Sequence, residues 1–133
     1  MNTVVVDRLD SLRAHLAAVE LPELYSVTLL NTWGELNISA QLAAHHPPQI
    51  ATGLLAWADT LTNVTTEAWR VPSGDTVHLS VIGRLPGDVS IRVYGGMPFI
   101  EHGLGAELAP DASTTVPPAV LRHLATPGEV TLS

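Results

Sequence analysis

The chain contains no cysteine and no lysine. Without cysteine it has no disulfide, no thiolate nucleophile and no zinc–sulfur site, so the redox compartment cannot be read from cysteine usage. Charged residues make up only 14% of the chain, against roughly 25% in typical soluble domains. A surface with so few charges is covered by small polar and apolar side chains, which makes association easier.

Positive charge is scarce: six basic residues stand against thirteen acidic ones, and the net charge is −7. Binding to a phosphate backbone rests largely on clustered Lys and Arg, so direct contact with nucleic acid is disfavoured. The acidic residues are scattered along the chain. An acidic inhibitor of a nucleic-acid-binding enzyme therefore requires the fold to gather them on one face.

Long apolar runs are also missing, and no stretch approaches the roughly 20 residues of a membrane span. The N-terminal segment MNTVVVDRLD lacks the basic flank and apolar run of a signal peptide. We expect a cytoplasmic protein without a membrane partner.

The 133 residues suffice for a substantial core. Residues 97–133 hold half of the ten prolines and show no alternation. We therefore expect an α+β domain at 1–96 and a proline-rich C-terminal arm at 97–133, with a short helix at 118–125. The arm is docked on the body, exchanged with a partner, or mobile.

Two segments have helical periodicity. Residues 3–20 repeat apolar side chains at three- and four-residue spacing, and residues 46–61 do so after two prolines that suit a first helical turn. The predicted buried stripes are Val5, Leu9, Leu12, Leu16 and Val19 in the first helix, and Ile50, Leu54, Trp57, Ala58 and Leu61 in the second. His15 is expected at the surface.

Two β-hairpins follow from alternation. Pairing 24–32 with 35–43 sets Leu29 opposite Ile38, Val27 opposite Ala40 and Tyr25 opposite Leu42. In 76–95, Val81 faces Ile91 and Leu79 faces Val93, across an odd loop. We favour the five-residue loop 84–88, in which Pro86 and Gly87 form the centre of a type II turn.

A strand at 64–71 precedes the second hairpin. An odd loop around the turn residues 72–75 places Trp69 beside Leu79 and Val71 beside Val77. Trp57 and Trp69 are thus expected inside, at the cost of turning Glu67 toward the covered face. The predicted fold is an α+β two-layer sandwich in the order αββαβββ. It has a five-stranded, mainly antiparallel sheet with two helices on one face, plus an irregular C-terminal arm.

The segments TLLNTWGELNISAQLA, LLAWADTLTNVT, SGDTVHLSVIGR and IRVYGG resemble small uncharacterised proteins of actinomycete-type, GC-rich bacteria. The likeness covers roughly residues 5–96. It implies the origin and the fold, and carries no activity or catalytic residue.

The residues with chemical potential are His78, Ser80, Arg92 and Tyr94, which alternation places together on the sheet face away from the helices. Arg92 suits an anion, Tyr94 stacking and His78 proton transfer. Trp33, at the tip of the first hairpin, is expected to be exposed. The pair His45-His46 lacks the spacing of a metal site, so we expect no metal and no cofactor.

The favoured interpretation is a non-enzymatic bacterial module for protein–protein interaction or self-assembly, a homo-oligomer that uses the outer sheet face and the C-terminal arm. The first alternative is a small-ligand-binding protein or small hydrolase with its site at His78, Arg92 and Tyr94. The second is the acidic inhibitor.

Overall fold

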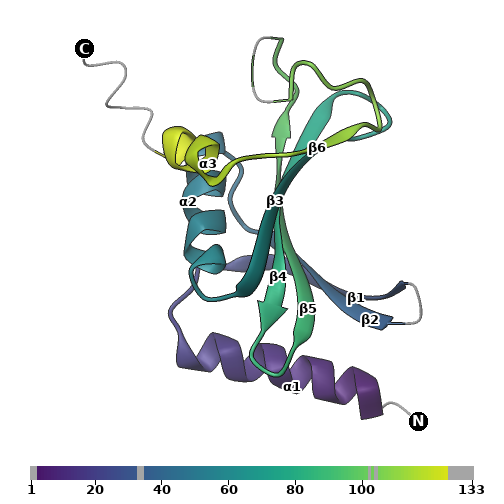
Figure 1. Cartoon of the computed structure of the whole chain (residues 1–133), viewed down its shortest axis with the longest axis vertical. Helices are drawn as coiled ribbons and strands as arrows, with labels where there is room; N and C mark the ends of the chain where they lie inside the picture. Colours follow the sequence, from purple (N-terminus) through teal and green to yellow (C-terminus); the bar gives the residue numbers. More distant parts are fainter. Residues whose placement is uncertain (1–2, 33–34, 102, 104, 126–133) are drawn as a thin grey trace.

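The computed structural model describes residues 3–32, 35–101, 103 and 105–125. Its elements are α1 (Thr3–Ala18), β1 (Leu24–Thr32), β2 (Glu35–Leu42), α2 (Pro47–Ala58), β3 (Thr62–Arg70), β4 (Thr76–Leu85), β5 (Val89–Pro98), β6 (Ser113–Thr115) and α3 (Pro118–Ala125). The strands form one sheet in the order β1-β2-β5-β4-β3-β6, with α2 packed beside it and α1 beneath its end (Figure 1). The α+β class is confirmed.

The sheet differs from the predicted one in two ways. It is mixed, because β2 and β5 pair in parallel, with Ile38 beside Ile91 and Ala40 beside Val93. It also has a sixth strand, since β6 pairs antiparallel with β3. The paired strands β2 and β5 belong to two different hairpins. No turn connects them directly, so the sequence contains no local signal of this parallel pairing.

The layers meet where α2 lies on β4 and β5. Ile50, Leu54 and Trp57 are fully buried there. A Cβ added to Gly95 would lie 2.7 Å from Cγ2 of Ile50, so the helix rests directly on the backbone of β5. The two prolines begin the helix as predicted, but it ends at Ala58, before the predicted Leu61.

The β4–β5 hairpin keeps the predicted faces in a shifted register. Val81 pairs with Val93 rather than with Ile91, because the loop has three residues instead of five. The N–H of Asp88 donates to the carbonyl of Leu85 at 3.0 Å, and Gly87 has φ 91°, as a type II turn requires. A two-residue shift leaves every side chain on its own face, so Val81 and Ile91 are fully buried as expected.

In the first hairpin the predicted pairs Leu29–Ile38 and Val27–Ala40 are confirmed, but Leu42 pairs with Leu24. Tyr25 was predicted at that position. A bulge between Leu24 and Ser26 displaces it from the ladder, and the Tyr25 side chain is 73% exposed.

The predicted position of Trp69 is wrong. Trp69 pairs with His78 and lies on the outer face, while Ala68 pairs with Leu79 and is fully buried. The turn at 72–75 is an even loop of four residues, closed by the N–H of Val71 donating to the carbonyl of Thr76 at 2.9 Å. The even loop also turns Glu67 outward, which removes the cost of burying a carboxylate.

Arg70, next to Trp69, therefore takes an inward position. Its Nε and Nη1 donate to the carbonyls of Gly74 and Leu108, each at 2.9 Å. Its guanidinium carbon lies 3.6 Å from the ring centroid of Phe99. These contacts satisfy a half-buried charge and tie the chain after β5 to the turn before β4.

Helix α1 covers less of the core than its periodicity predicts. Leu12 is buried, but Leu9 and Leu16 are exposed, because α2 already occupies the centre of the sheet. His15 is buried, contrary to expectation, and its Nε2 lies 2.9 Å from Oγ1 of Thr60. The Thr60 hydroxyl donates to a backbone carbonyl, so Nε2 of His15 donates to it, and burial lowers the pKa of this histidine.

The C-terminal arm is docked on the body as far as Ala125. It contributes the buried side chains of Leu108, Val116 and Leu121, and α3 packs on α2 (Figure 1). The helix predicted at 118–125 is confirmed.

We expect Gly95→Ala to lower the free energy of unfolding by about 1–3 kcal/mol, since α2 must move off the sheet. Gly96→Ala is the matched control. It adds the same methyl group to the outer face, where the nearest atoms are 3.4 Å away, and should be neutral or up to about 1 kcal/mol stabilising. Urea unfolding of both variants measures the difference, and equal effects would contradict the close approach of α2.

Candidate functional site

The outer face of the central strands carries five neighbouring side chains, which we call the outer-face cluster: Trp69 from β3, His78 and Ser80 from β4, and Arg92 and Tyr94 from β5. Strand alternation turns them all away from α2. The four residues expected from the sequence, His78, Ser80, Arg92 and Tyr94, therefore do lie together. Trp69 is an addition that the wrong register concealed.

The aromatic members form a continuous series across three strands. The ring of His78 stacks on Tyr94, with centroids 5.0 Å apart and planes at 21°. Trp69 meets the other side of His78 edge-on, at 5.3 Å and 79°. Gly96 lies opposite His78 in the ladder, and a Cβ there would lie 3.4 Å from Cδ2 of the ring, an ordinary contact distance.

Arg92 is held from two sides. Its Nε donates to Oγ of Ser80 at 3.2 Å, and its guanidinium carbon lies 5.2 Å from the Tyr94 ring centroid. The Tyr94 hydroxyl donates to Oε1 of Gln41 on β2 at 3.4 Å. These contacts fix the planar groups before any ligand arrives, which lowers the entropy lost on binding.

The electrostatics of the cluster favour a neutral histidine. Burial among the aromatic rings lowers the pKa of His78, and the positive charge of Arg92 lowers it further. At neutral pH the cluster itself therefore carries one charged side chain, the cation of Arg92. The indole N–H of Trp69 donates to Oδ1 of Asp111, just outside the cluster, at 3.1 Å.

A hollow of about 210 Å³ lies on the same face, beside Arg92. Its lining combines the polar residues Asn37, Ser39 and Ser90 with the apolar residues Leu30 and Ile82. None of the described lining residues is a carboxylate. Sequence reasoning missed this hollow, because its walls come from both hairpins and their parallel junction was not foreseen.

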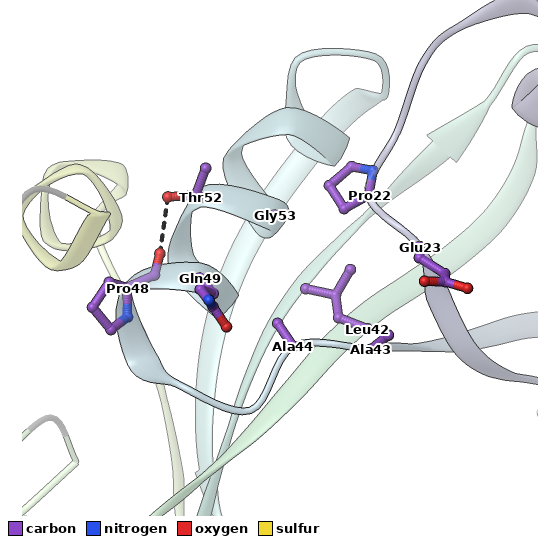
Figure 2. A pocket seen from close by; sticks show the side chains of 9 residues that line it. All are labelled: Pro22, Glu23, Leu42, Ala43, Ala44, Pro48, Gln49, Thr52 and Gly53. Carbon is purple, nitrogen blue, oxygen red and sulfur yellow. Dashed lines mark hydrogen bonds between the residues drawn. The ribbon is translucent and has the colours of Figure 1, made fainter.

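A larger groove, of about 490 Å³, lies on the helix-bearing face between α2 and the start of β1. Figure 2 shows Pro22 across from Gly53, with Leu42 below them in this view. A Cβ on Gly53 would meet Cδ1 of Leu42 at 3.0 Å, so this helix glycine keeps the groove open. The lining is mostly apolar, with Glu23, Gln49 and Thr52 as its polar members.

Trp33, the fifth expected site residue, lies outside the described residues. Within the described ranges, no group of three or more His, Asp or Glu side chains is arranged to hold a metal ion. Among the same residues, no helix has the length and hydropathy needed to cross a bilayer.

Comparisons with known proteins add no assignment. No protein-family model matches the chain, and neither a curated protein nor a solved structure does.

The pKa of His78 should be measurably below 6.5 and should rise when the charge of Arg92 is removed. We expect Arg92→Gln to raise it only in part, because burial, the larger cause, remains. NMR titration of the histidine ring protons measures both values. Arg13→Gln, at an exposed arginine paired with Asp10 on α1, is the control and should leave the His78 titration unchanged. An unaltered pKa in Arg92→Gln would contradict the coupling.

Proposed function

We propose that the protein is a non-enzymatic module that binds a partner protein through the outer-face cluster. One observation carries the proposal: Trp69, Tyr94 and Arg92 are half-buried and preorganised on a sheet face that no helix of the described chain covers. Trp, Tyr and Arg are the residues that most often dominate the binding energy of protein interfaces.

The contacts of His78 favour binding over catalysis. Its neighbours are the rings of Trp69 and Tyr94. A general base is normally oriented by a hydrogen bond to its second ring nitrogen, and His78 makes none within the described residues. We therefore assign the ring a packing role between the two aromatic anchors.

The position of the C-terminal arm makes the proposed binding surface smaller than the one expected from the sequence, which included the arm. As far as Ala125, the arm already contacts the rest of its own molecule: β6 pairs with β3, and α3 packs on α2. The surface that we propose for partner binding is therefore the outer sheet face alone.

Substitutions in the outer-face cluster should weaken partner binding. Immobilised protein is used to capture partners from a lysate of cells that express it, and affinity for a recovered partner is then measured by interferometry. We expect Trp69→Ala or Arg92→Glu to weaken binding by about 2 kcal/mol, roughly 30-fold. Arg13→Glu on α1 is the control and should bind normally. A partner that binds all variants equally would contradict the proposal.

A second candidate function is binding of a small oxyanion, a carboxylate or phosphate, in the hollow beside Arg92. It is favoured by the polar lining from Asn37, Ser39 and Ser90, and by the absence of a carboxylate among the described lining residues. Arginine offers several N–H donors to oxyanions in a fixed geometry.

Inorganic phosphate and acetate are the probes for this second function. If either binds in the hollow, titration should shift the backbone amide signals of Ser39 and Ser90, and Arg92→Gln should remove those shifts. Shifts that persist in Arg92→Gln, or that fall elsewhere on the protein, would argue against an anion site at this position.

A further inference from the structure

The strand β1 forms one edge of the sheet and pairs only with β2 in the described chain. It is nine residues long, LYSVTLLNT, and contains no charged residue and no proline. Proteins normally protect such edges with charge, proline, short strands or bulges. The opposite edge follows that rule, since β6 has three residues, whereas β1 has only the bulge near Tyr25.

Large apolar side chains are exposed on both faces of this edge strand. Val27, on the helix-bearing face, is 40% exposed, and Leu30, on the outer face, is 48% exposed. Val27 lies on the core side of the sheet, opposite the fully buried Ala40. Its exposure therefore marks a part of the core face that the helices of the described chain do not reach.

Exposed apolar side chains also occur on the nearby helix α1. The Nε of Arg8 donates to the carbonyl of Leu36 at 3.1 Å, which holds the N-terminal half of α1 beside the β1–β2 hairpin (Figure 1). Val4, Val6 and Leu9 on this half of the helix are exposed. Both layers thus leave apolar groups uncovered near the same end of the molecule.

We propose that β1 pairs antiparallel with β1 of a second copy of this chain, about a two-fold axis perpendicular to the sheet. An isologous contact requires a surface that complements itself. Antiparallel pairing keeps each face on its own side, so Val27 and Leu29 of the two copies meet on the helix-bearing side.

The charge distribution also favours a second copy of this chain as the partner of β1. Two copies that each carry a net charge of −7 repel one another wherever acidic surfaces approach. The edge strand β1 carries no acidic group along its nine residues, so it is a place where like copies meet without opposing carboxylates. This inference does not depend on the proposed partner-binding function.

Cysteine scanning tests the pairing directly, because the chain has no cysteine of its own. Val27→Cys, Thr28→Cys and Thr114→Cys are each oxidised mildly. Residues near the two-fold axis of an antiparallel pair lie roughly 4.5–5.5 Å apart at Cα, within the range of a disulfide. We expect disulfide-linked dimers for at least one β1 variant and none for Thr114→Cys, on the β6 edge. Equal cross-linking at both edges, or none at β1, would overturn the proposal.

Light scattering on size-fractionated protein supplies an independent readout. We expect the unmodified chain to form a dimer and Val27→Lys to weaken it by at least about tenfold, since two lysines would then oppose each other near the axis. Ile100→Lys, at an exposed apolar residue outside the sheet, should dimerise normally, and circular dichroism checks that both variants fold. A monomeric unmodified chain, or a folded Val27→Lys protein that dimerises as tightly, would overturn the pairing.

Discussion

The contact between Ile50 of α2 and the bare backbone of Gly95 in β5 determines how the two layers of the molecule fit together. It centres α2 over β4 and β5, where period-two alternation supplies an unbroken apolar surface. With the centre occupied, α1 is left at the margin and buries only Leu12 and His15. In the described part of the chain, the β1 end of the core face is left partly uncovered as a result, with Val27 40% exposed.

The faces of the central hairpin were predictable because alternation is insensitive to a shift by two. Val81 and Ile91 are buried in the predicted register and in the observed one alike, although they are not partners. For the same reason His78, Ser80, Arg92 and Tyr94 could be grouped from the sequence. These four residues share a face only if the loop between β4 and β5 has an odd number of residues. The turn-forming pair Pro86 and Gly87 correctly indicates such a loop.

The errors arose where distant parts of the chain decide the local structure. Trp69 was expected inside for its size, whereas Arg70 takes the inward position because the carbonyl of Leu108 and the ring of Phe99 receive it. Neither of these contacts of Arg70 can be predicted from the sequence of β3 alone. Glu67 was a local indication against the predicted register, because a register that turns Trp69 inward also turns the carboxylate of Glu67 inward. The parallel junction of β2 with β5 and the burial of His15 against Thr60 likewise depend on distant segments.

The candidate surfaces are physically linked through Leu30. This residue is exposed on the edge strand β1 and also lines the hollow beside Arg92. A strand added to β1 would lie directly beside Leu30, so it would extend the wall of the hollow with its own outer-face side chains. In a two-fold pair the outer faces of both sheets point the same way, because antiparallel pairing preserves the faces. Two outer-face clusters would then lie on one continuous sheet surface, and a partner spanning both would gain from their effective concentration.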